Sequence, residues 1–110
     1  MSPKILQVNF KFRIPRADLE AAFLPAAQPI ADTPGLRWKI WLMNEAEHTA
    51  GGIYLFENEA AVQAWMAGSI VASMMTNPVL SNIEAKVFDM LERHTAITRG
   101  PVMEALNIAV

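Results

Sequence analysis

Two periodicities of apolar residues alternate along this chain, and their order constrains the fold more than any other feature. Four segments alternate apolar and polar side chains with the two-residue period of a β-strand: residues 4–12, 36–42, 49–56 and 79–91, the last centred on 83–89. Two further segments have the spacing of an amphipathic helix: residues 17–24 and 58–76. A polar stretch at residues 44–47 joins the two middle strands as a hairpin. The order strand, helix, strand, strand, helix, strand predicts an α+β, ferredoxin-like βαββαβ fold, with a four-stranded antiparallel sheet and both helices on one face.

Single residues predict where the helices break and begin, and the tail has its own pattern. Pro25 and Pro29 each lack an amide donor and clash with the preceding turn, so the first helix should kink or break. Asn58 is well placed to cap the second helix. The C-terminal tail, residues 92–110, is predicted to hold one short helix, Val102 to Asn107.

Large apolar side chains occupy both faces of the predicted sheet. Trp38 and Trp41 point to opposite faces in the second strand, as Val87 and Phe88 do in the fourth. Hydrophobic residues make up 53% of the chain, a high share for a small domain, which has little interior relative to its surface. The face without helices should therefore be buried as well. We expect residues 1–110 to form a single domain that assembles into a homodimer by stacking sheet on sheet.

Composition and missing motifs exclude several classes of function. Nine Lys and Arg against eleven Asp and Glu leave a net charge of −2, so we expect no nucleic-acid partner and no membrane partner. The most apolar stretch, residues 64–75, is shorter than a membrane-spanning helix, no leader segment is expected, and the absence of cysteine favours the cytoplasm. His48 and His94 lack further ligands at regular spacing, so no metal site is expected. The motifs of serine hydrolases, kinases and dinucleotide-binding proteins are missing too.

Aromatic and sulfur-containing side chains concentrate in the two middle strands and the second helix. They are Trp38, Trp41, Tyr54, Phe56, Trp65, Met66, Met74 and Met75. Such residues can line a pocket for a flat apolar molecule, because indole and phenol faces stack and methionine adapts its shape. Ordinary core is the alternative for the same set. Lys39 and Lys86 lie mid-strand among apolar neighbours, and such lysines usually extend to solvent or pair with a carboxylate.

The hairpin region holds a second group of candidates. Gly51 and Gly52 interrupt the third strand, which indicates either a β-bulge or the close approach of another group to the backbone. His48 lies next to this strand, and its ordinary pKa is close to neutrality, so it is a candidate base for a phenol-like substrate. The alternative is an exposed histidine of the hairpin.

Three strings in register carry a resemblance to one known family. They are Pro34–Trp41 (PGLRWKIW), His48–Phe56 (HTAGGIYLF) and Ala85–Asp89 (AKVFD). Together they resemble the YdhR monooxygenase family, a branch of the dimeric alpha-beta barrel superfamily. The resemblance runs from the first strand to Asp89, whereas the tail beyond Leu91 does not match. It implies a ferredoxin-like protomer, a homodimer whose two sheets form a barrel, and a pocket between sheet and helices in each subunit.

The resemblance and the missing motifs together lead to a functional hypothesis. We expect a monooxygenase that needs no cofactor and oxidises a small aromatic substrate, such as a phenol or a dihydroquinone, with O₂. The superfamily also includes isomerases, decarboxylases and haem-degrading enzymes, so fold similarity does not fix the reaction. An isomerase, a non-catalytic binding or stress-related dimeric module, and the use of a borrowed flavin or haem all stay open.

The hypothesis assigns roles to seven residues. The expected catalytic residues are His48, as the base, and Tyr54, as a hydrogen-bond donor to a substrate oxygen. The expected substrate-binding residues are Asn9, Trp38, Trp41, Trp65 and Met66. Asn9, Trp65 and Tyr54 are chemical analogues of groups implicated in cofactor-free enzymes of the superfamily. Because successive side chains of a strand point to opposite faces of the sheet, Trp38 and Trp41 cannot both face one pocket.

Overall fold

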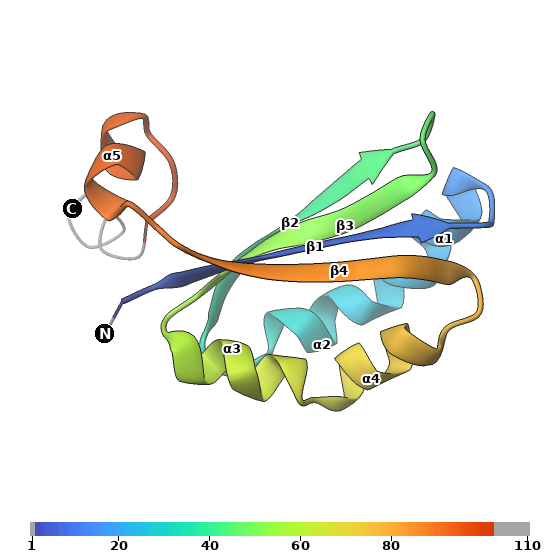
Figure 1. The fold of residues 1–110 in the computed structure, drawn as a ribbon, viewed down its shortest axis with the longest axis horizontal. Helices are drawn as coiled ribbons and strands as arrows, with labels where there is room; N and C mark the ends of the chain where they lie inside the picture. The colour runs from blue at the N-terminus through green and yellow to red at the C-terminus, as the bar shows by residue number, and fades with distance from the viewer. Residues whose placement is uncertain (1, 103–110) are drawn as a thin grey trace.

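The computed structural model describes residues 2–102, which form one antiparallel sheet and its covering helices (Figure 1). The elements in chain order are β1 (Lys4–Phe12), α1 (Arg16–Phe23), the 3₁₀ turn η1 (Leu24–Ala26), α2 (Ala27–Ala31), β2 (Leu36–Asn44), β3 (Thr49–Phe56), α3 (Glu59–Met66), α4 (Ser69–Thr76), β4 (Leu80–Asp89) and α5 (Glu92–Ile97). The strand order is β2-β3-β1-β4, and all paired strands are antiparallel. This confirms the predicted ferredoxin-like arrangement.

The strand register assigns each side chain to one of two faces, because residues directly opposite each other on paired strands share a face. Leu6 pairs with Tyr54 and with Val87, and Tyr54 pairs with Lys39. Leu6 and Tyr54 belong to the core that packs under the helices. Their face is therefore the one that α1 to α4 cover (Figure 1), which we call the helix face. The opposite face, which we call the open face, carries Gln7, Asn9, Trp38, Ile40, Leu42, Ile53, Leu55, Glu84, Lys86 and Phe88. The core lies on the helix face and includes Leu6, Val8, Phe10, Leu19, Tyr54 and Phe56.

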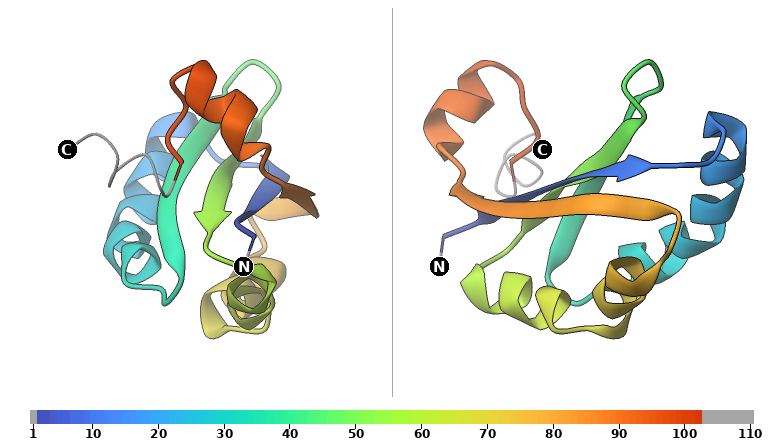
Figure 2. Two further views of the ribbon diagram at one scale, coloured as in Figure 1. Left: turned by 90° about the vertical axis from the view of Figure 1, so that its left-hand side faces the viewer. Right: turned by 45° about the vertical axis from the view of Figure 1, so that its right-hand side comes forward.

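The first helical segment breaks where its prolines predict. α1 ends at Phe23, and Pro25 lies in the 3₁₀ turn that follows. Pro29 lies in the first turn of α2, where a missing N–H removes no intrahelical hydrogen bond. The break bends the chain around the edge of the sheet, so that α1 and α2 both cover β2 and β3 (Figure 2).

The second helical segment differs from the single helix predicted over residues 58–76. Asn58 does cap α3 by accepting a hydrogen bond from the backbone N–H of Ala61 at 2.9 Å. Gly68, however, is extended, with ψ of 174°, and it separates α3 from α4. Its N–H donates to the carbonyl oxygen of Trp65 at 3.0 Å, which closes α3. The prediction of one continuous helix is therefore wrong.

The chain after β4 turns to the other side of the sheet. Figure 1 shows α5 on the side away from α1 to α4, and Figure 2 shows the same separation in two further views. The indole Nε1 of Trp38 donates to the carbonyl oxygen of Pro101 at 3.3 Å, and Val102 is buried. This segment therefore covers one end of the open face, where Leu55 is fully buried. Apart from Val102, the short helix predicted over Val102 to Asn107 lies outside the described residues.

Candidate functional site

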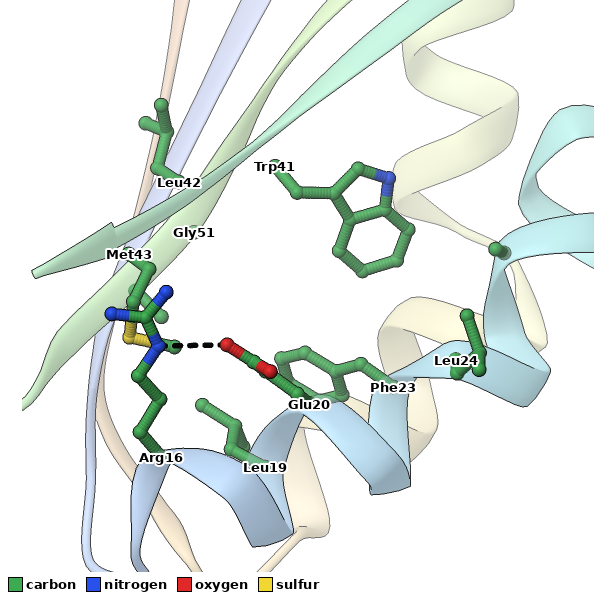
Figure 3. Close-up of a pocket in the computed structure, with 11 residues that line it drawn as sticks. Arg16, Leu19, Glu20, Phe23, Leu24, Trp41, Leu42, Met43 and Gly51 are labelled. Atoms are coloured by element: carbon green, nitrogen blue, oxygen red, sulfur yellow. Dashed lines mark hydrogen bonds and ion pairs between the residues drawn. The ribbon is translucent and has the colours of Figure 1, made fainter. Parts of the chain in front are cut away.

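A cavity of about 380 Å³ lies between α1 and the strands β2 and β3. We call it the α1 cavity. Phe23 and Leu24 line it from the helical side, and Trp41 and Met43 line it from β2. Figure 3 shows the Trp41 ring extending from the strand towards Phe23, and their ring centroids are 6.0 Å apart. The walls are mainly apolar and aromatic, as in pockets that bind small organic molecules.

One charged pair borders the α1 cavity. The Nε of Arg16 donates to the Oε2 of Glu20 at 2.7 Å, one helical turn away on α1 (Figure 3). Both side chains are about half exposed, so the pair marks the solvent side of the cavity. Because each charge already has its partner, the pair offers a polar rim and no free charge.

Two smaller cavities continue along the helix face. The lysine cavity, of about 50 Å³, is lined by Lys39 and Tyr54 and shares Phe23 and Trp41 with the α1 cavity. The α3–α4 cavity, of about 130 Å³, shares Tyr54 with the lysine cavity. Its lining also includes Trp65, Met66, Val71, Met74 and Met75. The three cavities therefore adjoin one another between the sheet and the helices.

Lys39 is the charged group at the centre of this row. Its Nζ lies 3.4 Å from the ring centroid of Trp41 and 4.5 Å from that of Tyr54. Within residues 2–102, no ion pair joins Lys39 to a carboxylate. Burial lowers the pKa of Lys39 to about 8. The expectation that this lysine extends to solvent or pairs with a carboxylate is therefore wrong, whereas Lys86 is exposed on the open face.

Gly52 makes room for the Lys39 side chain. A Cβ atom added at Gly52 would lie 2.5 Å from the Cε of Lys39, and one added at Gly51 would lie 1.9 Å from the carbonyl oxygen of Val8. The register of β3 with β1 and β2 is continuous across both glycines. The glycines therefore mark the close approach of other groups, and the alternative of a β-bulge is excluded.

Tyr54 and Trp65 bring two polar hydrogens to the same apolar region. Burial raises the pKa of Tyr54 to about 12, so its hydroxyl stays protonated at neutral pH. The Tyr54 and Trp65 rings are in contact, with centroids 5.5 Å apart. The Nε1 of Trp65 is buried and has no hydrogen-bond partner within the described part of the chain. An unpaired buried donor is costly, so this N–H is a candidate donor to a ligand.

Comparison with known proteins places the chain in one family. The family described as "Putative mono-oxygenase ydhR" matches residues 5–101, so the expectation that the tail beyond Leu91 does not match is wrong. The chain belongs to this family. No curated protein matches it.

The solved structures that resemble this YdhR-family protein share its fold. The protein NE2512 of unknown function from Nitrosomonas europaea is 26% identical, with a TM-score of 0.67 over 83% of this chain and 91% of that one. A variant of SnoaB, a cofactor-independent oxygenase from Streptomyces nogalater, is 17% identical, with a TM-score of 0.67 over 83% and 95%. The heme-degrader MhuD from Mycobacterium tuberculosis is 22% identical, with a TM-score of 0.62 over 79% and 95%. At these last two identities the likeness shows the fold alone.

The structure brings four of the seven expected site residues of the YdhR-family protein to the helix-face cavities. Trp41 lines the α1 and lysine cavities, and Tyr54 lines the lysine and α3–α4 cavities. Trp65 and Met66 both line the α3–α4 cavity. Tyr54 belongs to the linings of both the lysine cavity and the α3–α4 cavity, so these four residues form one contiguous lining.

The other three expected residues lie elsewhere. His48 is exposed at the tip of the β2–β3 hairpin, with φ of 52°, and its ring is 5.4 Å from that of Phe12. It lines none of the three cavities. Its role as the base therefore stays a prediction, and no contact within the single chain supports it. Asn9 and Trp38 lie on the open face, on the opposite side of the sheet from Tyr54.

Sequence reasoning missed Lys39 and Phe23 as site residues. Lys39 is two residues from Trp41, so the period of two places both on one face, and this signal was available in the string WKIW. Phe23 packs on Phe10 in the core, with ring centroids 5.8 Å apart. Its contact with Trp41 depends on how the helix crosses the sheet, which the sequence does not specify.

Two kinds of structural element are absent from the described residues: a cluster of metal-ligating side chains and a membrane-spanning helix. In residues 2–102, no three His, Cys, Asp or Glu side chains are grouped so as to hold a metal ion. No helix in the same range is long and apolar enough to cross a membrane.

Proposed function

We propose that this YdhR-family protein is a cofactor-independent monooxygenase that oxidises a small aromatic substrate, such as a phenol or a dihydroquinone, with O₂. Membership of the family supports the general kind of activity. The observation that carries the substrate class is the aromatic lining of the α1 cavity, where the Phe23 and Trp41 rings adjoin with their centroids 6.0 Å apart. Aromatic walls of this kind favour a flat ring that stacks on them.

The proposed reaction uses the substrate as its own reductant. It must supply all four electrons that convert O₂ into one inserted oxygen atom and one water. An aromatic anion gives up electrons more readily than the neutral form, so the site must favour deprotonation of the substrate. Tyr54 lines the lysine cavity beside the α1 cavity, where its protonated hydroxyl would donate a hydrogen bond to a substrate oxygen. The unpaired N–H of Trp65 would donate to an oxygen that reaches the α3–α4 cavity.

A haem-dependent reaction has less support from this chain. Most haem proteins hold the iron with a histidine or a cysteine thiolate. The sequence has no cysteine, and neither His48 nor His94 lines the α1, lysine or α3–α4 cavity. Haem therefore has no part in the proposed reaction.

We also propose that the protein functions as a homodimer formed through the open face. Ile40 and Phe88 are each 47% exposed on this face of the single chain. They lie on the two edge strands, so apolar surface extends across the sheet. A second sheet packed against this face would bury it.

Oxygen uptake tests the proposed activity. Purified protein is incubated under air with a panel of phenols and dihydroquinones, and oxygen consumption is followed with an electrode after dialysis against a chelator. We expect oxygen uptake with at least one substrate and an oxygenated product. The rate of uptake should fall by about tenfold or more in Trp41→Leu, because a misplaced substrate ring loses its reactive geometry. Trp38→Leu is the matched control, because it removes an indole ring from the open face, away from the cavities. Turnover is compared only if both variants remain dimeric.

Three outcomes would contradict the proposal. Binding without uptake across the panel would favour a non-catalytic binding module. A rearranged product with no oxygen consumed would favour an isomerase. Activity that disappears on dialysis and returns with added flavin, haem or metal would refute cofactor independence.

A further inference from the structure

We propose that Lys39 makes the helix-face cavities selective for aromatic ligands that carry an oxyanion, such as a phenolate, an enolate or an aromatic carboxylate. The proposal rests on the proposed function, because it specifies the charge of the ligand that the same site would take. It concerns binding, so it can be tested without turnover.

The first argument is the missing counter-charge of Lys39. Its ammonium faces the rings of Trp41 and Tyr54 and has no ion pair within residues 2–102. A cation largely removed from water is costly unless an anion or a hydrogen-bonded network compensates it. Ring faces compensate only part of that cost. An anionic ligand would supply the rest.

The second argument is that no other charged group in the cavities competes for this role. The side chains from α2 and α4 that line the lysine cavity are apolar, and they are Ile30, Ile70 and Met74. Tyr54, from β3, is protonated at neutral pH. On α1, Arg16 and Glu20 border the adjoining cavity but are paired with each other at 2.7 Å. Lys39 is therefore the unpaired charge that a ligand in the described cavities would meet.

The third argument is size. The lysine cavity, at about 50 Å³, can hold a water-sized polar group but no aromatic ring. The α1 cavity, at about 380 Å³, is large enough for a ring and shares Phe23 and Trp41 with the lysine cavity. A ligand would therefore place its ring in the α1 cavity against Phe23 and Trp41, and its oxyanion towards Lys39. Gly52 keeps the space that the Lys39 stem needs in this arrangement.

This arrangement gives Lys39 a direct role in the proposed oxidation. An ammonium that favours the bound oxyanion lowers the pKa of a bound phenol or enol, because an opposite charge within about 4–6 Å favours the charged form. The substrate would then be held as the anion that reduces O₂. Lys39 would thus be a catalytic residue that touches the substrate oxygen.

A matched pair of unreactive probes tests the selectivity. 1-Naphthoate and 1-naphthamide have the same rings and differ in the charge of one substituent, and their affinities are measured by isothermal titration calorimetry. We expect the wild-type protein to prefer 1-naphthoate by about tenfold or more. Lys39→Met should lose about 30-fold in affinity for 1-naphthoate, which corresponds to about 2 kcal/mol, and little for 1-naphthamide. Lys39→Arg should restore part of the preference, and Lys11→Met, which removes an exposed lysine, should change neither affinity.

The wild-type pH profile provides a second readout that needs no variant. Because the anion binds the protonated amine, the affinity for 1-naphthoate should be constant below about pH 8, the pKa of free Lys39, and fall above it. The affinity for 1-naphthamide should stay flat over the same range. This profile keeps the proposal testable even if Lys39→Met does not fold.

The outcomes separate this proposal from the proposed oxidation. Equal affinities for the two probes, a flat pH profile for 1-naphthoate, no binding of either probe, or an unchanged preference in folded Lys39→Met would each overturn the proposal. Charge selectivity without oxygen uptake by any substrate would support the anion site and contradict the oxidation. Oxygen uptake without charge selectivity would support the oxidation and contradict the anion site.

Discussion

The half-buried ammonium of Lys39 lowers the stability of the folded protein at neutral pH. The lysine amine has an ordinary pKa of 10.5, and burial lowers it to about 8 in the folded chain. Between these values the unfolded chain holds a proton that the folded chain releases, so the stability of the wild-type protein rises with pH from about 8 to 10.5. At pH 7 both states are protonated, and the full cost of burying the charge is present.

Replacing Lys39 with methionine should therefore stabilise the protein. We expect Lys39→Met to raise the free energy of unfolding at pH 7 by on the order of 2 kcal/mol, since the contacts with two rings already offset part of the burial cost. The gain should shrink by pH 9.5, where the wild-type amine is largely neutral. Urea unfolding at the two pH values measures it, with Lys11→Met as the control. A gain that is equal at both pH values would show that the charge of Lys39 is not its cause.

Gly51 and Gly52 should respond differently to substitution by alanine. The added Cβ of Gly51→Ala meets the carbonyl oxygen of Val8, a backbone atom that cannot move without disturbing β1, so we expect a loss of about 3 kcal/mol or more. The added Cβ of Gly52→Ala meets mainly the flexible end of Lys39, so we expect a loss of about 1 kcal/mol. Because Lys39 must move, Gly52→Ala should also weaken 1-naphthoate binding. Unfolding midpoints and calorimetry check both effects, and equal destabilisation would contradict this account.

His48→Ala decides whether the hairpin histidine acts as the base. Loss of a general base typically costs about 10² to 10⁴ in rate, which is the effect expected from the sequence hypothesis. The exposed position of His48 against Phe12 instead favours a change of less than about twofold, since the ring lines none of the three cavities. Turnover of the wild-type and variant proteins with the same substrate, measured across neutral pH, distinguishes the two. A loss of a hundredfold or more would assign the base to His48.

At the scale of secondary structure, the sequence predicts the strands better than the helices. The period of two is set by the pleat itself, so β1 and β3 begin and end where predicted. It tells which residues share a face but not which face meets the helices, because in β2 the helix-face set contains Lys39, whereas the open-face set of Trp38, Ile40 and Leu42 is apolar. The break at Gly68 is invisible in the pattern, since apolar residues continue on both sides of it and a single glycine costs only about 1 kcal/mol in a helix. The α5 helix, over Glu92–Ile97, is too short to leave a periodic signal.

The cap of α3 should contribute measurably to stability. The Oδ1 of Asn58 accepts from the backbone N–H of Ala61 at 2.9 Å and satisfies a donor that the helix leaves unpaired. Asn58→Ala should lower the free energy of unfolding by about 1 kcal/mol, whereas Asn58→Asp, which keeps the acceptor, should lower it by less than half as much. Urea unfolding of both variants measures this. Equal losses would show that the cap is not the source of the effect.

At the scale of the whole molecule, the sheet separates two surfaces with different roles. The helix face is closed by α1 to α4 and holds the three cavities, whereas the chain from α5 to Val102 covers only one end of the open face (Figure 1). The rest of the open face combines the apolar side chains of Ile40 and Phe88 with polar ones such as Asn9 and Lys86. The site could be predicted from the sequence only in part, because tryptophans suited to a pocket occur on both surfaces.

The proposed dimer predicts that a charge introduced on the open face separates the subunits. Ile40 is 47% exposed on β2, and in a two-fold symmetric assembly an Ile40→Glu substitution would place a carboxylate from each copy within the same buried interface. We expect the wild-type protein to be dimeric at micromolar concentration in sedimentation equilibrium and Ile40→Glu to dissociate at least tenfold more readily, since a buried unpaired charge is costly. Leu24→Glu is the matched control, because Leu24 is 74% exposed on η1, on the other side of the sheet. A monomeric wild-type protein, or a Leu24→Glu variant that dissociates while Ile40→Glu does not, would contradict assembly through the open face.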